Sequence, residues 1–180
     1  GITHDGYTEL VRTRLGDMGL GLAGLHEFAD PVAAVNEAEG VFVGGGNTFV
    51  LLRALYEADL VEPLRERALQ GMPYMGSSAG SNLAGLTIGT TNDMPVVEPG
   101  SFRALGLVPF NINPHYLDPD PGSTHMGETR ETRIGEFHGN RLMHLGHALM
   151  LLTVPLLIVV SLKFMKMLPE RGAWLGFLGC

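Results

Sequence analysis

Short apolar segments that end in glycine, each followed by a helical pattern, constrain the fold of this chain most. The segment 40–43 (Gly-Val-Phe-Val) precedes the glycine triplet 44–46, and a helical pattern then covers 48–58. The segment 72–75 likewise precedes a glycine-rich turn, after which we expect a helix to begin near Gly80. Strands that alternate with helices through short turns pair in parallel and are covered on both faces. The sequence therefore predicts an α/β fold, a three-layer sandwich with a mostly parallel sheet.

The rest of the N-terminal two thirds fits the same plan. Apolar spacing predicts a helix over 7–18, a strand over 22–25 and a helix over 63–69. Asp30 followed by proline is typical of a helix start, so we expect another helix from there to Ala38. Residues 90–124 are rich in proline and lack a helical period, which predicts ordered loops of the kind that often carry function.

Charge and cysteine content exclude several classes of function. The 180 residues suffice for one domain, and 19 acidic against 12 basic residues give a formal net charge of −7. Such a chain lacks the basic face that nucleic-acid phosphates require, so we expect no nucleic-acid partner. The single cysteine, Cys180, leaves no internal disulfide, and no leader segment opens the chain, so we expect a cytoplasmic protein. We also expect no metal or other cofactor, because no zinc-protease pattern adds an acidic ligand to His144 and His147.

An apolar run near the C-terminus has two interpretations. Residues 148–162 carry no charge, and Lys163 and Lys166 follow them. A membrane-spanning helix needs roughly 20 such residues, and Pro155 interrupts this shorter run. We therefore expect a buried core segment, with membrane insertion as the alternative.

The sharpest chemical motif is a G-x-S-x-G sequence, from Gly76 to Gly80. At a strand-to-helix junction the two glycines allow a tight turn that lifts the central Ser78 clear of the sheet, and the N–H of Ala79 then faces a developing oxyanion. Ser77 is off centre in the motif, so we predict that Ser78 is the nucleophile.

The glycine triplet 44–46 is the second motif. With Asn47 it presents backbone N–H groups at the start of a helix, an arrangement that suits an anion. The nucleotide-binding patterns fail: no G-x-x-x-x-G-K-[ST] is present, and Phe49 breaks G-x-G-x-x-G. We therefore expect Gly45, Gly46 and Asn47 to form the second half of an oxyanion hole.

Spacing alone does not choose the general base or the carboxylate that orients it. His115, in an Asn-Pro-His-Tyr segment of the loop region, is one of seven histidines. The candidate carboxylates are Asp93, Glu98, Asp118, Asp120, Glu128 and Glu170.

Six segments, in order over residues 30–134, resemble peptidase E, the family of alpha-aspartyl dipeptidases. They are Ala-Asp-Pro at 29–31, Val-Gly-Gly-Gly-Asn-Thr-Phe at 43–49, Gly-Ser-Ser-Ala-Gly at 76–80, Thr-Thr-Asn-Asp-Met-Pro at 90–95, Ile-Asn-Pro-His at 112–115 and Gly-Glu-Thr-Arg at 127–130.

The resemblance implies a fold related to class I glutamine amidotransferases, and a serine exopeptidase that hydrolyses dipeptides with an N-terminal aspartate through an acyl-enzyme. It implies Ser78 as nucleophile and His115 as base. Asp93 is our preferred third member and Glu170 the alternative, because the family has a similar Leu-Pro-Glu segment. An aspartate substrate needs a cation, ideally an arginine. Arg130 and Arg133 are the candidates.

The chain also departs from the family. We expect one domain over 1–180, with the family's first strand and its strands after Trp174 missing, and with an atypical insertion over 139–167. Two alternative functions follow. A binding module would keep the pocket without turnover, whereas a general esterase or amidase of the α/β-hydrolase type would use the same serine without a demand for aspartate.

Overall fold

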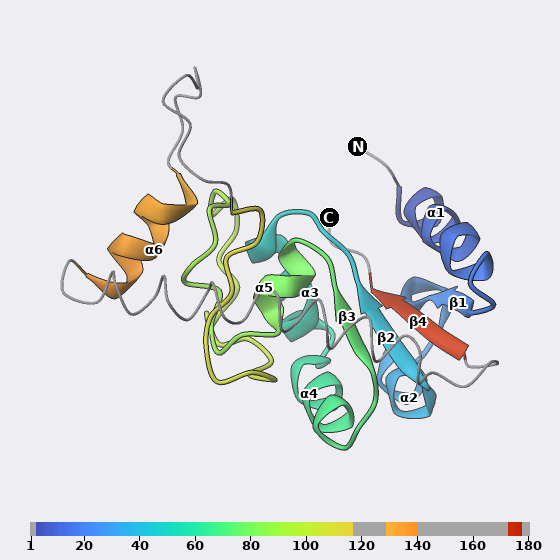
Figure 1. Cartoon of the computed structure of the whole chain (residues 1–180). Helices are drawn as coiled ribbons and strands as arrows, with labels where there is room; N and C mark the ends of the chain where they lie inside the picture. Colours follow the sequence, from blue (N-terminus) through green and yellow to red (C-terminus); the bar gives the residue numbers. More distant parts are fainter. Residues whose placement is uncertain (1–2, 117–128, 140–172, 178–180) are drawn as a thin grey trace.

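The computed structural model describes residues 3–116 and 129–139, together with the backbone of 173–177 (Figure 1). Four parallel strands form one sheet in the order β1-β4-β2-β3. Their bounds are β1 (Gly21–Gly24), β2 (Gly40–Val43), β3 (Tyr74–Gly76) and β4 (Ala173–Phe177). The α/β class with a parallel sheet, predicted from the alternating patterns, is confirmed.

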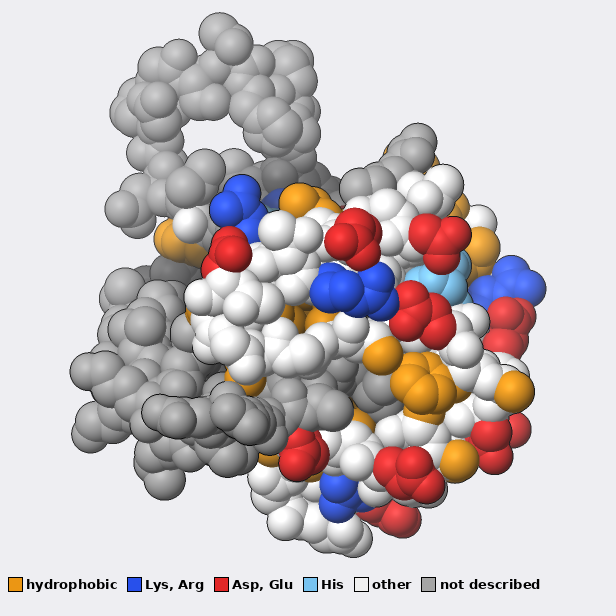
Figure 2. Space-filling model, turned by 90° about the vertical axis from the view of Figure 1, so that its right-hand side faces the viewer, with side chains coloured by type: hydrophobic (Ala, Val, Ile, Leu, Met, Phe, Trp, Pro, Cys, Tyr) orange, Lys and Arg blue, Asp and Glu red, His pale blue; other side chains and the backbone are white. Residues whose placement is uncertain are grey.

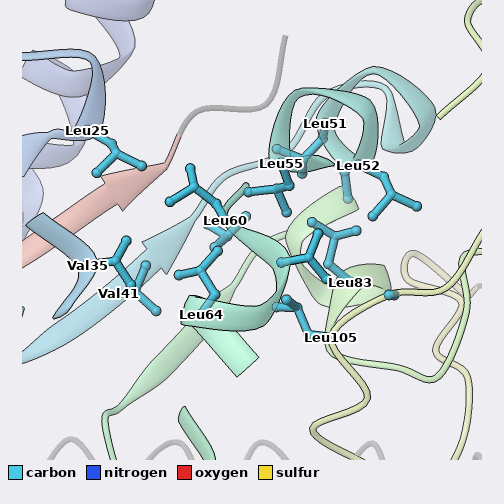
Figure 3. Packing of buried hydrophobic residues seen from close by; sticks show 14 of the residues in the cluster. Leu25, Val35, Val41, Leu51, Leu52, Leu55, Leu60, Leu64, Leu83 and Leu105 are labelled. Atoms are coloured by element: carbon cyan, nitrogen blue, oxygen red, sulfur yellow. The ribbon is translucent and has the colours of Figure 1, made fainter. Parts of the chain in front are cut away.

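Helices cover both faces of this sheet. They are α1 (His4–Gly16), the 3-10 turn η1 (Leu25–Glu27), α2 (Pro31–Glu37), α3 (Thr48–Glu57), α4 (Val61–Leu69), α5 (Ala79–Leu83) and α6 (Arg130–His138). Val41 and Val43 of β2 face the main core, where buried leucines of α3, α4 and α5 converge on them (Figure 3). Leu22 of β1 points to the opposite face and packs with Leu15 of α1. Alternation along the strands thus separates two apolar layers, one on each side of the sheet.

Strand β4 was not predicted from the sequence. The sequence pattern gave no strand at 173–177, and the absence of the family's strands after Trp174 stays a prediction. In the structure β4 lies between β1 and β2 and pairs with both, so that Leu175 has Ala23 on one side and Val41 on the other (Figure 1). The β1–α2–β2 unit therefore crosses over one position in the sheet, and a distant segment fills that position.

Capping side chains explain why several helices begin where they do. Asp30 accepts a hydrogen bond from the N–H of Ala33, as the Asp-Pro pair predicted. Thr3 caps α1, which begins at His4, three residues before the predicted start, and Thr129 caps α6, which the sequence reasoning did not predict. The other predicted helices and strands agree with the structure to within two residues at most boundaries.

The surface on the side of α1 and β1 carries interspersed charges (Figure 2). Arg12 of α1 donates hydrogen bonds to Glu9 and Glu27, and its Nε atom donates to the carbonyl of Leu22 in β1. The hydrogen bond from Arg12 lowers the pKa of Glu27 below its ordinary value. This network ties α1 to the edge of the sheet.

Several predictions fall on residues that lie outside the described part of the chain. These are the apolar run 148–162, the insertion 139–167, Glu170, and the pair His144 and His147. Among the described helices, none has the length and apolar character needed to cross a membrane. The expected cytoplasmic location stays a prediction.

Candidate active site

The turn between β3 and α5 has the geometry of a nucleophile elbow. Ser78 sits at this turn with φ of 54° and ψ of −111°, a backbone conformation that is strained for a residue with a side chain. Glycine is required on both sides. A Cβ on Gly76 would lie 2.5 Å from the carbonyl oxygen of Gly80, and a Cβ on Gly80 would overlap the carbonyl group of Val43.

Hydrogen bonds hold the strained turn against β2. The N–H of Ser77 donates to the carbonyl of Val43 at 2.9 Å, and the N–H of Gly80 donates to the carbonyl of Gly44 at 3.1 Å. From β3, the hydroxyl of Tyr74 donates to the carbonyl of Gly80 at 2.6 Å. Desolvation raises the pKa of this phenol above its ordinary value, so it donates as a neutral group.

His115 lies directly against the elbow. Its Nε2 atom is 2.8 Å from the Oγ atom of Ser78, the distance of a hydrogen bond between a hydroxyl and a base. His115 also has a positive φ, 63°, so both partners of this pair occupy strained backbone positions. The structure brings together the two residues that the sequence singled out separately, and it leaves Ser77 out of the pair.

The glycine loop after β2 approaches the same serine. A Cβ on Gly45 would lie 3.1 Å from the Cβ atom of Ser78, so the missing side chain leaves room above the nucleophile. Within the described residues, the N–H groups of Gly45 and Ala79 donate to no partner. Gly46 has a φ of 130°, which favours glycine. Two free donors beside the serine can hold an oxyanion.

Asn47 has a structural role in this loop. Its Oδ1 atom accepts hydrogen bonds from the N–H groups of Phe49 and Val50, which caps α3, and its Nδ2 atom donates to the carbonyl of Met94. The side chain predicted to bind substrate is therefore engaged in holding the start of α3.

Asp93 lines the pocket in front of Ser78 and His115 but bonds to α3. Its Oδ2 atom accepts from the N–H of Thr48 at 2.7 Å and from the Thr48 hydroxyl at 2.5 Å. No hydrogen bond joins it to His115 in the structure. A carboxylate at a helix N-terminus interacts favourably with the helix dipole, and Asp93 fills this role at the start of α3.

Three polar residues of the pocket wall were missed by the sequence reasoning. Asn82, Thr91 and Asn113 are buried and line the pocket with Ser78. The signal that could have identified them is a polar side chain inside an otherwise apolar or glycine-rich segment, as Asn82 is in α5. Buried polar groups of this kind are kept for hydrogen bonds.

The two predicted arginines have different surroundings. Arg130, the first residue of α6, lines the pocket with Ser78 and His115. Arg133 lies one turn further along α6, where its Nη1 atom is 3.2 Å from Glu136. Among the described residues, no group of three or more histidine, cysteine or acidic side chains is arranged to hold a metal ion.

A sequence match over most of the chain shows the family to which this fold and this site belong. Residues 2–150 match Peptidase family S51, and the chain belongs to that family. The resemblance drawn from the six segments is thereby confirmed.

Individual relatives have related names. The chain is 61% identical over 134 residues to a protein named Peptidase E of Streptomyces coelicolor, covering 74% of this chain and 55% of that protein. It is 61% identical over 135 residues to a probable alpha-aspartyl dipeptidase of Drosophila melanogaster, covering 74% of this chain and 56% of that protein. The chain thus spans about half the length of the curated relatives it matches.

Proposed function

We propose that this chain is a serine exopeptidase that hydrolyses dipeptides with an N-terminal aspartate through an acyl-enzyme. The observation that carries the proposal is the 2.8 Å contact between His115 Nε2 and Ser78 Oγ at a strained elbow. The names of the relatives, Peptidase E and probable alpha-aspartyl dipeptidase, support the choice of substrate.

The geometry supports a two-step reaction. His115 accepts the proton of Ser78 while Oγ attacks the peptide carbonyl, and the N–H groups of Gly45 and Ala79 receive the negative oxygen. The protonated imidazole then gives its proton to the leaving amine, the C–N bond breaks, and an ester to Ser78 remains. Water, deprotonated by His115, attacks that ester; the bond to Ser78 Oγ breaks, His115 returns the proton to Oγ, and aspartate is released.

Arg130 is the proposed partner of the substrate's side-chain carboxylate. It is the one cation among the described residues that lines the pocket, and a guanidinium can hold a carboxylate through two parallel hydrogen bonds. Arg133 remains a second candidate, but its pairing with Glu136 makes it the less favoured one.

Asp93 is the proposed orienting carboxylate for His115, with Glu170 as the alternative. Asp93 is the acidic residue that lines the pocket within the described part of the chain. Its Oδ2 atom is engaged by Thr48, which leaves Oδ1 to accept a hydrogen bond from the imidazole.

Peptide selectivity tests the proposal. The purified chain should hydrolyse Asp-Leu and should leave Glu-Leu and Asn-Leu nearly untouched, because both alter the carboxylate that Arg130 would hold. Measurable affinity for Asp-Leu without turnover would instead identify a binding module. Rapid hydrolysis of p-nitrophenyl esters, with no preference for aspartate, would identify a general esterase.

A further inference from the structure

We propose that the side-chain carbonyl oxygens of Asn82 and Asn113 bind the free α-ammonium group of the substrate. The inference rests on the proposed function and identifies the groups that would select a substrate with an unblocked N-terminus. Both oxygens are buried, lie in residues that line the pocket with Ser78, and have no hydrogen-bond partner among the residues that the structure describes.

The orientation of the Asn82 amide is fixed by its neighbours. The hydroxyl of Thr48 gives its one proton to Asp93, so its oxygen can only accept from other groups. Asn82 Nδ2 donates to that oxygen at 3.3 Å, and the hydroxyl of Thr91 donates to it at 3.2 Å. Turning the amide over would place two acceptors against each other. Its Oδ1 atom is therefore the end that no described residue bonds, in a side chain that is 2% exposed.

The Asn113 amide is fixed in the same way. Its Nδ2 atom donates to the backbone carbonyl of Thr90, which can only accept, and to Asn92 Oδ1 at 2.9 Å. Asn113 is 5% exposed, and within the described part of the chain its Oδ1 atom has no partner. Native structures rarely leave a buried acceptor unpaired, and two in the wall of one pocket call for a donor that arrives from outside.

An ammonium group meets this requirement at the right place. In a dipeptide the amino nitrogen and the carbonyl carbon share one Cα, which keeps them roughly 2.5 Å apart. When Ser78 attacks that carbonyl, the amino nitrogen must lie within the same pocket. A primary ammonium carries three N–H donors and a positive charge that Asp93 complements, whereas an acylated amine carries one donor and no charge.

The des-amino analogue succinyl-Leu tests the inference, because it keeps the side-chain carboxylate and the scissile bond of Asp-Leu but lacks the amine. We expect kcat/KM for Asp-Leu to exceed that for succinyl-Leu by about 100-fold or more, as for sites built to pair a polar group. Asn82→Ala and Asn113→Ala should each reduce this ratio by about tenfold or more. The reduction should come from a lower kcat/KM for Asp-Leu, with kcat/KM for succinyl-Leu unchanged.

Two further variants control for folding and for amide loss in general. Asn111 exchanges hydrogen bonds with Thr87 outside the pocket, so Asn111→Ala should leave the ratio unchanged. Asn113→Asp keeps an acceptor oxygen for the ammonium but loses the donor to the Thr90 carbonyl, so it should retain the preference for the free amine at a lower melting temperature. A ratio near one in the parent protein, or a ratio unmoved in both alanine variants, would overturn the inference and leave the two oxygens to ordered water.

Binding measured without turnover separates this inference from the proposed function. In a Ser78→Ala background, calorimetry should show Asp-Leu binding more tightly than succinyl-Leu, and Asn113→Ala should remove the difference. If the parent protein binds both peptides with this difference but hydrolyses neither, the proposed catalysis fails and the ammonium site stands. If it hydrolyses both equally well, the catalysis stands and the ammonium site fails.

Discussion

Among single residues, the two adjacent serines of the elbow allow a direct comparison of a proposed nucleophile with a control. Ser78 contacts His115 Nε2, whereas Ser77 is exposed and contributes its backbone N–H to β2. Ser78→Ala should therefore lower kcat by about 10⁴ to 10⁶, the range measured when a triad nucleophile is removed, while Ser77→Ala should stay within a few-fold of the parent. Steady-state kinetics on Asp-Leu make the comparison. Equal losses in both variants would show that the wrong serine has been assigned.

Asp93 and Glu170 are the two candidates for the carboxylate that orients His115, and Asp93 also accepts hydrogen bonds from Thr48. If Asp93 orients His115, Asp93→Asn should lower kcat by up to about 10⁴ and Glu170→Gln should not. Asp93→Asn should also destabilise the fold by about 1–2 kcal/mol, because Thr48 at the start of α3 loses a charged acceptor. Kinetics and thermal unfolding on the same samples separate the two effects. Near-parental turnover in Asp93→Asn together with loss of turnover in Glu170→Gln would transfer the orienting role to Glu170.

Some residues of the site could be predicted from a short stretch of sequence, and others could not. Ser78 could be predicted because the elbow is specified within five consecutive residues. The spacing did not select His115, since its pairing with Ser78 depends on where a long loop runs over the sheet. Asn82 and Asn113 were missed because their burial, and the bonds that leave their oxygens unpartnered, exist only in three dimensions.

At the scale of elements, the close packing of α5 on β2 depends on glycine. Gly80→Ala would place a methyl group on the carbonyl of Val43, so the elbow would have to separate from the glycine loop. We expect loss of turnover and a lower melting temperature. Gly16→Ala is the control, because a Cβ at the end of α1 meets nothing within 4 Å, and it should be neutral or stabilising by up to about 1 kcal/mol. Unchanged turnover in Gly80→Ala would refute the close approach.

Elements with local signals were well predicted, and those that depend on distant partners were not. Strand β2 has the predicted bounds, and α2 begins at the predicted Asp-Pro pair, because capping and apolar spacing act over a few residues. The segment 173–177 gave no comparable signal. Its strand conformation depends on hydrogen bonds to β1 and β2, which no short window of sequence contains.

For the whole molecule, β4 joins the two halves of the sheet. Leu175 lies in the middle of β4 and pairs with Ala23 and Val41. Leu175→Pro should remove a backbone donor inside the sheet and lower the melting temperature sharply, because proline is tolerated only at sheet edges and bulges. Leu175→Ala keeps the donor and should cost less. Circular dichroism during heating compares the two, and equal melting temperatures in the proline variant and the parent would show that β4 does not hold this position in solution.

The strand order also sets a sequence of events for the newly made chain. Gly40 pairs with Trp174, and closing a loop of roughly 130 residues carries an entropic cost that local pairs such as β2 with β3 avoid. Topology of this kind slows folding relative to proteins rich in local contacts. The half that bears Ser78 can assemble while the ribosome is still adding residues, whereas β1 must wait for β4 before it joins the sheet. A nascent chain of this protein is therefore expected to carry the Ser78 half of the sheet folded before β1 joins it.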